Sequence, residues 1–377
     1  MTSLPIASRC RDIDASGIRK VFELAEQRRR DGVELVDLSI GQPDFPVPDV
    51  IKQAAVEAIW ADFNAYTVTQ GIQPLRDKVA GMVRERIGVD PEAVMITSGV
   101  SGGLLLALLA TVGPGDEVII VDPFFVMYKH LVTLAGGKSV ILSSYDDFSL
   151  PLDRIADAIN DRTKVILLNS PCNPTGCVYG EGELRQLAEL AEKHNLLVVS
   201  DEIYRCLWYD QPPASIVKMI PHRSILLDGF SKSLALTGWR VGYATGPRQI
   251  LEQMTKLQQY TFVCAPSFAQ KATMAMDQFD LEPIRQQYAR RRDLVYEGLK
   301  DHFEVVRPGG GFYIFPKAPI QPAAKFVEMA LERNVLVIPG KVFSEHDTHF
   351  RISYARREEE LARGVEILRD LAGRIGR

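Results

Sequence analysis

Cysteine is scarce in this 377-residue chain, and the five cysteines that occur are scattered. Their number is odd, and no two of them are spaced as Cys-x-x-Cys. That pattern argues against a disulfide framework and against a cysteine zinc site, so we expect reduced thiols. The six histidines include one close pair, His346 and His349, with no cysteine cluster nearby. We interpret this pair as a solvated surface feature and predict no metal site.

Long apolar runs are also missing. Residues Met1–Arg11 contain no apolar core of signal-peptide length, and no run elsewhere approaches a membrane span. With 44 basic and 48 acidic residues the formal net charge is −4, which gives no general reason to expect nucleic acid or an anionic membrane as a partner. We therefore predict a cytoplasmic protein with neither kind of partner.

The middle of the chain alternates short β-rich apolar runs with helical patterns, which is typical of a mostly parallel α/β sheet. The candidate strands are Val94–Thr97, Glu117–Val121, Ser139–Ser143, Lys164–Leu168, Leu196–Ser200, Ser224–Leu227 and Val241–Thr245. Amphipathic spacing predicts helices over Ala15–Arg30, Gly182–His194 and Glu282–Phe303.

The length allows two domains. We predict an α/β fold with a large domain, residues 49–285, in which a mostly parallel seven-stranded sheet lies between helices. A smaller α+β domain is expected from both chain ends, residues 1–48 and 286–377. Open α/β sheets bind ligands beyond the carboxyl ends of their strands, and several polar residues lie just past such ends.

Three polar segments follow predicted strands. Lys232 lies in Gly229-Phe230-Ser231-Lys232 and is followed by Thr237-Gly238-Trp239-Arg240. Asp201 ends the apolar run before Glu202-Ile203-Tyr204, and Asn173-Pro174-Thr175-Gly176 follows an earlier strand. Taken singly, each has an ordinary explanation, because a lysine is usually solvated and Asn-Pro and Thr-Gly are turn formers.

In this order the three segments resemble the class I/II aminotransferases of pyridoxal-5′-phosphate (PLP) fold type I. The resemblance is to the branch with the bacterial aspartate and aromatic aminotransferases, and it runs from about Ile13 to Tyr354. It implies a PLP-dependent aminotransferase that moves the α-amino group of an L-amino acid to a 2-oxo acid. The expected mechanism is ping-pong, through a Schiff base on Lys232.

The resemblance also implies roles for the catalytic residues. Lys232 would hold the cofactor and then act as general base. Asp201 would keep the pyridine nitrogen protonated, so that the ring can accept carbanion charge. Asn173 and Tyr204 match the residues that hydrogen-bond the phenolic oxygen of the cofactor.

Further positions match contacts to the cofactor. Arg240 supplies a fork suited to phosphate, and the glycine-rich start of a helix supplies backbone N–H groups. Phe125 matches the aromatic side chain that stacks on the pyridine ring. Tyr66 matches a tyrosine that reaches the phosphate from the neighbouring subunit, which implies a homodimer with shared active sites. The remaining implied cofactor contacts are Gly99, Val100, Ser101 and Ser231.

Substrate recognition is expected at the α-carboxylate. Arg351 matches the arginine that binds it as a fork, with help from Gly41 and Asn173. The sequence departs from the pattern at Gly229, where some relatives carry a phosphate-binding serine. We identify no second arginine for a dicarboxylate side chain, so aromatic and aliphatic donors stay open.

Two other functions are compatible with parts of the pattern. A PLP-dependent C–S lyase or a related lyase on the same fold would use the same cofactor site. A non-catalytic PLP-binding regulator is a more distant alternative, because such regulators carry an added DNA-binding domain. The motifs here begin within about 40 residues of the N-terminus, which leaves little room for one.

Overall fold

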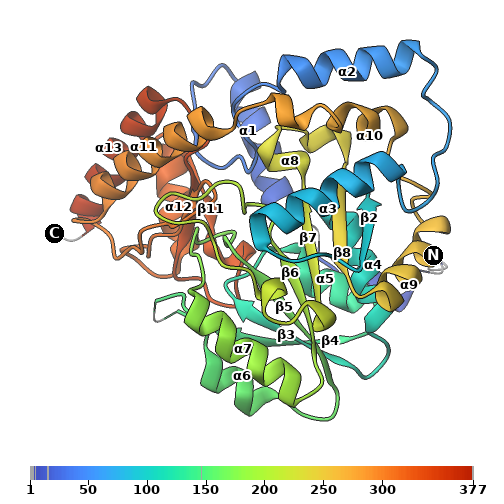
Figure 1. The fold of residues 1–377 in the computed structure, drawn as a ribbon. Helices are drawn as coiled ribbons and strands as arrows, with labels where there is room; N and C mark the ends of the chain where they lie inside the picture. The colour runs from blue at the N-terminus through green and yellow to red at the C-terminus, as the bar shows by residue number, and fades with distance from the viewer. Residues whose placement is uncertain (1–3, 5, 15–16, 146, 376–377) are drawn as a thin grey trace.

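The computed structural model describes residues 4, 6–14, 17–145 and 147–375. Within that part of the chain, seven strands form a central sheet with the order β2-β8-β7-β6-β5-β3-β4 (Figure 1). The strands are β2 (Ala93–Thr97), β3 (Glu117–Asp122), β4 (Lys138–Ser143), β5 (Thr163–Asn169), β6 (Leu197–Asp201), β7 (Ser224–Gly229) and β8 (Gly242–Gly246). Only β8 runs antiparallel to its neighbours β2 and β7. The predicted seven-stranded, mostly parallel sheet is confirmed, with every strand boundary within two residues.

The inner parallel strands are largely apolar because helices cover both faces of the sheet. Successive residues alternate between two cores. Ile119, Ile166 and Val198 belong to one core, and their chain neighbours Val118, Val165 and Val199 belong to the other. A strand buried on both faces has no polar side, which is why these segments read as continuous apolar runs in the sequence.

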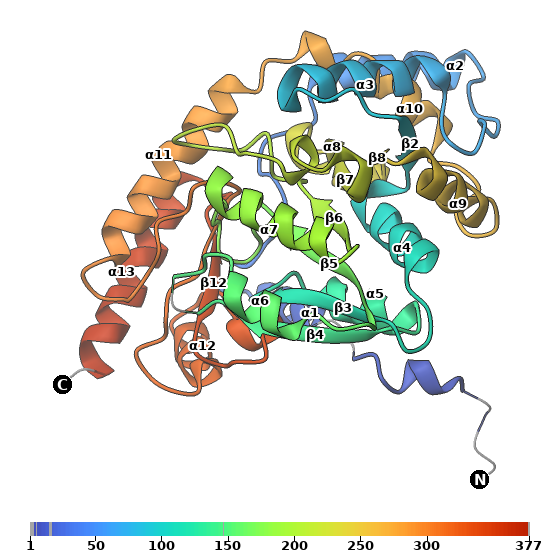
Figure 2. The ribbon, with the colours of Figure 1, turned by 60° about the horizontal axis from the view of Figure 1, so that its bottom comes forward.

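The covering helices follow from amphipathic segments between the strands. α3 and α7 contribute Val79 and Leu187 to one core, whereas α4 and α9 contribute Leu108 and Met254 to the other. The two layers are visible in Figure 2, where α4 and α9 lie on the side of the sheet away from α7. The helices of this part of the chain are α2 (Asp49–Trp60), α3 (Gln73–Ile87), α4 (Gly99–Thr111), α5 (Met127–Leu134), α6 (Leu152–Ala158), α7 (Glu181–Lys193), α8 (Phe230–Ser233), α9 (Arg248–Gln259) and α10 (Ser267–Thr273).

The two ends of the chain share a further core at one side of the molecule, where α11 and α13 lie side by side (Figures 1 and 2). Leu38 from the N-terminal segment packs there with Phe312, Phe350 and Leu368. The elements are α1 (Gly17–Arg30), β1 (Val36–Asp37), α11 (Glu282–Leu299), β9 (Tyr313–Ile314), α12 (Ala323–Glu332), β10 (Val335–Leu336), β11 (Ile338–Pro339), β12 (Phe350–Ser353) and α13 (Glu358–Ile375).

Small sheets join these ends. β1 pairs in parallel with β10, so residues 36 and 335 are neighbours, and β12 lies between β11 and β9. The exact domain boundaries, at residues 48/49 and 285/286, stay predictions. Short 3-10 helices span Ser8–Cys10, Ile216–Lys218, Pro221–Arg223, Thr237–Trp239, Met276–Gln278 and Gly340–Val342.

Three sequence-based expectations need correction or a limit. The long helix predicted to reach Phe303 ends at Leu299, and the predicted start of α1 at Ala15 lies outside the described residues. The interpretation of His346 and His349 as a solvated pair is wrong for His349. Its ring is 6% exposed and stacks on Phe315 at a centroid distance of 5.1 Å, and burial lowers its pKa to about 4.

No described helix is both long enough and apolar enough to cross a membrane. Within the same residues, no group of three or more His, Cys, Asp or Glu side chains is arranged to hold a metal ion.

Candidate active site

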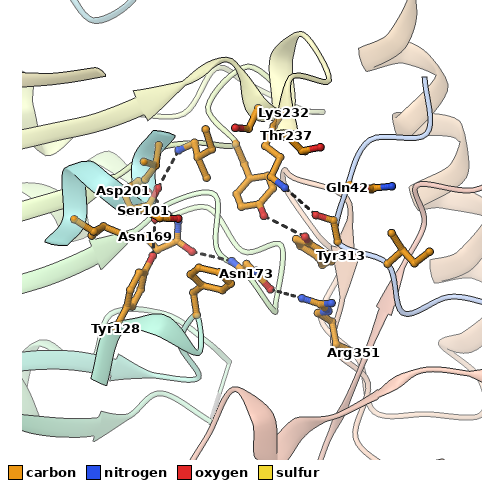
Figure 3. Close-up of a pocket in the computed structure, with 18 of the residues that line it drawn as sticks. Gln42, Ser101, Tyr128, Asn169, Asn173, Asp201, Lys232, Thr237, Tyr313 and Arg351 are labelled. Carbon is orange, nitrogen blue, oxygen red and sulfur yellow. Dashed lines mark hydrogen bonds between the residues drawn. The ribbon is translucent and has the colours of Figure 1, made fainter. Parts of the chain in front are cut away.

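A cavity of about 320 Å³ lies where β5, β6 and β7 end, facing β9 and β12 (Figure 3). Eleven of the thirteen predicted site residues line it, although they come from segments up to 310 positions apart, such as Gly41 and Arg351. Those eleven are Gly41, Val100, Ser101, Phe125, Asn173, Asp201, Tyr204, Ser231, Lys232, Arg240 and Arg351. The parallel strands produce this convergence, because their carboxyl ends meet at one edge of the sheet.

Lys232 lies on the short helix α8, directly after β7, and its side chain points into the cavity. Its Nζ donates a hydrogen bond to the Gly41 carbonyl oxygen at 2.8 Å. Burial lowers the pKa of this amine to about 8, and the positive charges of Arg351 and Arg240 act in the same direction. A large fraction of the amine is therefore neutral near pH 8, as a nucleophile or a base requires.

Asp201 is the last residue of β6, and its carboxylate is 3% exposed. Tyr128 donates its hydroxyl to Oδ2 at 2.9 Å, and the Ile203 backbone N–H donates to Oδ1 at 3.2 Å. Burial raises the pKa of Asp201 to about 6, while these two donors lower it. The result is a buried acid held in one orientation, with its charge available to a cationic group in the cavity.

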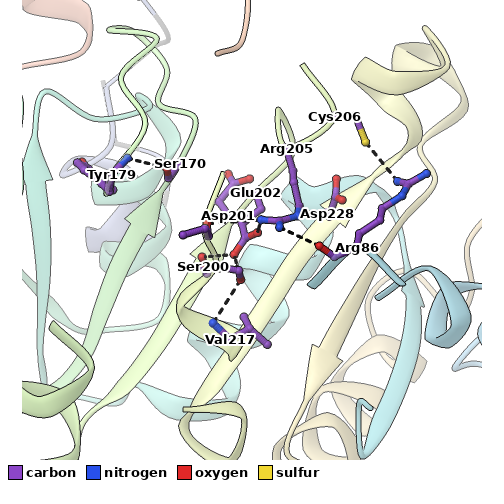
Figure 4. A network of polar contacts seen from close by, with 12 residues as sticks. Arg86, Ser170, Tyr179, Ser200, Asp201, Glu202, Arg205, Cys206, Val217 and Asp228 are labelled. Atoms are coloured by element: carbon purple, nitrogen blue, oxygen red, sulfur yellow. Dashed lines mark hydrogen bonds and ion pairs between the residues drawn. The ribbon is translucent and has the colours of Figure 1, made fainter. Parts of the chain in front are cut away.

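Behind Asp201 the chain continues into a buried ion pair (Figure 4). Glu202 accepts hydrogen bonds from Ser200 Oγ at 2.9 Å and Ser215 Oγ at 2.6 Å, and it pairs with Arg205 Nη1 at 2.8 Å. Burial raises the pKa of Glu202, whereas Arg205 and the hydroxyl donors lower it. The network neutralises the charge of Glu202, a second buried carboxylate next to Asp201, and fixes the end of β6 by hydrogen bonds.

Arg351, on β12, is a buried cation whose hydrogen-bond partners are neutral. Its Nη1 donates to Asn173 Oδ1 and its Nη2 to the Ser39 carbonyl oxygen, each at 2.9 Å. The Nε is buried and makes no hydrogen bond within the described part of the chain. The guanidinium carbon lies 4.4 Å from the ring centre of Tyr313 and 4.5 Å from that of Phe343. A buried guanidinium with an unpartnered donor is suited to a small carboxylate.

Another part of the cavity wall is suited to bind an anion. Arg240 has a left-handed backbone with φ of +56° and donates from Nη1 to the Thr237 carbonyl oxygen at 2.9 Å. Its guanidinium lies against the first turn of α4, where a Cβ added at Gly99 would be 2.7 Å from Arg240 Nη2. The 13-residue helix α4 adds backbone N–H groups and the positive end of its dipole.

The comparisons agree with this geometry. Residues 33–368 match the family described as aminotransferase class I and II. The chain belongs to this family. It is an enzyme of the aminotransferase type, as predicted.

Relatives of this aminotransferase cover nearly its whole length. A probable aspartate aminotransferase from Methanocaldococcus jannaschii is 36% identical, covering 97% of this chain and 99% of its own. The aspartate/prephenate aminotransferase of Thermus thermophilus is 37% identical over 93% of this chain and 94% of its own. The structure of the T. thermophilus aspartate aminotransferase with maleate has a TM-score of 0.93 at 35% identity, covering 98% and 100% of the two chains.

Sequence reasoning missed several residues of the aminotransferase cavity. Tyr128 holds Asp201, and Asn169 joins two strand ends, since its Nδ2 donates to the Asp201 carbonyl oxygen and its Oδ1 accepts from the Asn173 N–H, both at 2.8 Å. Asn169 is a polar residue at the end of an apolar strand, a signal that could have found it. Tyr313 lies 3.1 Å from Tyr204, hydroxyl to hydroxyl, and follows a glycine-rich turn that carries no such signal.

Two predicted residues do not line the cavity. Gly99 lies behind Arg240, as described above. Tyr66 is 84% exposed and lines a separate, open hollow with Phe262 and Val263. In a single chain of this aminotransferase, Tyr66 therefore takes no part in the cavity.

Proposed function

We propose that this aminotransferase uses PLP to move the α-amino group of an L-amino acid to a 2-oxo acid in a ping-pong reaction. We also propose that it acts in the cytoplasm as a homodimer. One observation carries the proposal: Lys232, Asp201 and Arg351 converge on a single cavity from three distant parts of the chain. A lysine with a lowered pKa, a buried carboxylate and an arginine with an unpartnered donor are what such a reaction requires.

The residues present fit PLP. Asp201 offers a counter-charge for a protonated ring nitrogen, and Phe125 offers an aromatic face beside it. Arg240 and the start of α4 form the anion site that a phosphate needs. Tyr204 and Asn173 line the same cavity and supply hydrogen-bond donors for the phenolic oxygen. When bound, PLP supplies an aldehyde that takes up an amino group and a ring that accepts charge from the substrate Cα.

The side chains would divide the work as follows. Lys232 Nζ would hold the aldehyde group of PLP, and as a free amine it would take the proton from the substrate Cα. Asp201 would keep the ring nitrogen protonated through its negative charge. Tyr204 donates its hydroxyl to the phenolic oxygen, and Asn173 donates from Nδ2 because its Oδ1 already accepts from Arg351.

The substrate would be held by its α-carboxylate. Arg351 lines the cavity with the rings of Tyr313 and Phe343 close to its guanidinium, whose fork geometry matches a carboxylate. The backbone N–H of Gly41 is the proposed second donor. Relatives are named for aspartate, prephenate and aromatic amino acids, so the side-chain preference of this chain is a matter for assay.

The homodimer would complete the site. Tyr66 is exposed and shares an open hollow with Phe262 and Val263, which are also exposed apolar side chains. Exposed apolar side chains favour burial against a second copy. In the proposed dimer, the partner's Tyr66 reaches the phosphate.

A panel of half-reactions tests the proposal. Purified protein with PLP is mixed with each common amino acid, then with 2-oxoglutarate or pyruvate, and the absorbance of the bound cofactor is followed. We expect a reversible change with at least one amino acid and its reversal by a 2-oxo acid. Lys232→Ala should abolish both changes, whereas Lys271→Ala, an exposed lysine on α10, should leave them intact. Release of pyruvate and ammonia from a β-substituted amino acid, without any 2-oxo acid, would instead indicate a lyase.

A further inference from the structure

Tyr313 lies between the two halves of the proposed site and contacts both. Its hydroxyl is 3.1 Å from that of Tyr204, and its ring lies under the guanidinium of Arg351 at 4.4 Å. The side chain is 1% exposed and lines the cavity (Figure 3). We propose that Tyr313 is a positioning residue that directs the Tyr204 hydroxyl toward the cofactor and holds Arg351 flat for the substrate carboxylate. This inference rests on the proposed function.

The number of available hydrogens sets the direction of the hydrogen bond between Tyr204 and Tyr313. The Tyr204–Tyr313 hydrogen bond can run in either direction, and a phenol has a single hydrogen to donate. If Tyr204 gives its hydrogen to the phenolic oxygen of PLP, its oxygen must accept the hydrogen of Tyr313. Tyr313 then strengthens the bond that Tyr204 makes, because donors in a chain polarise one another.

Space for the Tyr313 hydroxyl depends on Gly41. A Cβ added at Gly41 would lie 2.7 Å from the Tyr313 hydroxyl oxygen, so a larger residue there would displace it. The carbonyl oxygen of the same glycine accepts from Lys232. Gly41 thus brings the Tyr313 hydroxyl and the Lys232 amine to the same side of the cavity.

The ring of Tyr313 acts on Arg351. The guanidinium carbon lies 4.4 Å from the ring centre of Tyr313 and 4.5 Å from that of Phe343. The strand register explains why they meet: Tyr313 pairs with Ser353 across β9 and β12, and Arg351 is two residues from Ser353, on the same face of β12. Two cation–π contacts restrict the guanidinium to one orientation, which prepares it to bind a ligand.

Substitutions separate the two effects. Tyr313→Phe removes the hydroxyl and keeps the ring, whereas Tyr313→Leu removes both. Phe343→Leu is the matched control, because it removes the other aromatic ring that contacts Arg351, and Phe343 has no hydroxyl group. Two quantities are measured on the PLP-loaded protein: the pH titration of the cofactor absorbance, and the Kd of two unreactive carboxylates, maleate and 3-phenylpropionate.

We expect the two single substitutions to change different quantities: Tyr313→Phe the titration midpoint, and Phe343→Leu the Kd of the carboxylates. A bond from Tyr204 to the phenolic oxygen favours loss of the proton on the Lys232 nitrogen, so weakening that bond raises the titration midpoint. Tyr313→Phe should raise it by about half a unit to one unit, the value of one net hydrogen bond, with less than a twofold change in Kd. For whichever carboxylate binds the parent more tightly, Phe343→Leu should raise the Kd by about threefold or more. The titration midpoint should not move. Tyr313→Leu should show both changes.

Other groups can influence the same titration. The charged groups around the two hydroxyls are Arg351 on β12, Lys232 on α8 and Asp201 at the end of β6. A Tyr204→Phe background separates them from Tyr313, because these groups remain in it. There, Tyr313→Phe should add no further shift, since its effect passes through Tyr204.

The outcomes are distinct. A parent protein that binds no PLP would contradict the proposed function and leave no cofactor titration to compare. A parent that titrates normally, together with a Tyr313→Phe midpoint equal to the parent's, would overturn the role of Tyr313. A full shift that persists in the Tyr204→Phe background would also overturn it, because the effect would then bypass Tyr204.

Discussion

Lys232 has a half-buried side chain and two cationic neighbours, so the reactivity of its amine should change with pH near pH 8. Its pKa is lowered to about 8, so the neutral amine forms at lower pH than in a solvated lysine. We expect the rate of covalent PLP attachment to the cofactor-free chain to rise about tenfold between pH 7 and pH 9 and then to level off. Stopped-flow absorbance measures this rate. A rate that keeps rising steeply beyond pH 9 would indicate an ordinary solvated lysine.

Asp201 is expected to act on the rate of the chemical step and much less on cofactor retention. Asp201→Asn preserves the shape of the side chain but removes the charge proposed to hold the ring-nitrogen proton. We expect kcat to fall by roughly 10²-fold or more, with PLP still bound. Tyr128→Phe is the control, because it removes one donor to Asp201 and leaves the carboxylate in place. Tyr128→Phe should keep most of the parent's kcat. A near-normal kcat in Asp201→Asn would rule out the proposed role of Asp201.

Among the elements, the contact between α4 and the sheet decides the anion site. Gly242 on β8 lies beneath the start of α4, and a Cβ added there would be 2.8 Å from the Gly99 carbonyl carbon and 2.9 Å from the Val100 nitrogen. Those are backbone atoms, which cannot rotate away. The absence of a side chain at residue 242 therefore allows the N-terminus of the helix to sit on the sheet edge.

Gly242→Ala should accordingly weaken phosphate binding. We expect at least a tenfold higher Kd for PLP, since displacing α4 affects charge-assisted hydrogen bonds worth about 1.5–3 kcal/mol each. Calorimetric titration of the cofactor-free protein measures this Kd. Gly81→Ala on α3 is the matched control, because a Cβ there meets no heavy atom of the described residues within 4 Å. It should bind PLP normally, and its helix should gain roughly 0.5–1 kcal/mol. Equal Kd values for both variants would show that α4 tolerates the shift.

For the whole molecule, the exposed position of Tyr66 leads to a test of subunit sharing. In the proposed homodimer, Tyr66→Asp would place a carboxylate beside the partner's phosphate, so homodimers of this variant should be nearly inactive, as should homodimers of Lys232→Ala. In a mixed dimer, one of the two sites combines an intact Lys232 with an intact Tyr66 from the other chain. Two-fold symmetry then predicts recovery of up to about half the parent's activity per dimer.

Co-expression with two affinity tags isolates the mixed dimers for this assay. Lys232→Ala paired with parent chains serves as the control, because it also leaves one intact site. Mixed dimers of the two variants that are confirmed by mass and remain inactive would place Tyr66 outside the partner's site.

Much of this protein could be predicted without coordinates. Strand positions followed from short apolar runs, because a parallel strand buried on both faces has no polar residues to interrupt it. The positions of Lys232, Asp201 and Asn173 followed because each comes just after such a strand, at the edge where open sheets bind ligands. Local chain chemistry determined these features, so local patterns in the sequence revealed them.

Contacts between distant segments were decided by the tertiary structure. Arg351 meets Asn173 across 178 residues, and Tyr128 reaches Asp201 across 73. No spacing along the chain encodes either pair, since the sheet order and the β9–β12 register bring them together. His349 was misjudged for the same reason: a polar residue beside polar neighbours reads as solvated, but the rings of Phe315 and Tyr145 fold over it. The burial that sets the pKa of Lys232, Asp201 and His349 exists only after folding, because desolvation is a property of the packed interior and not of any residue in the extended chain.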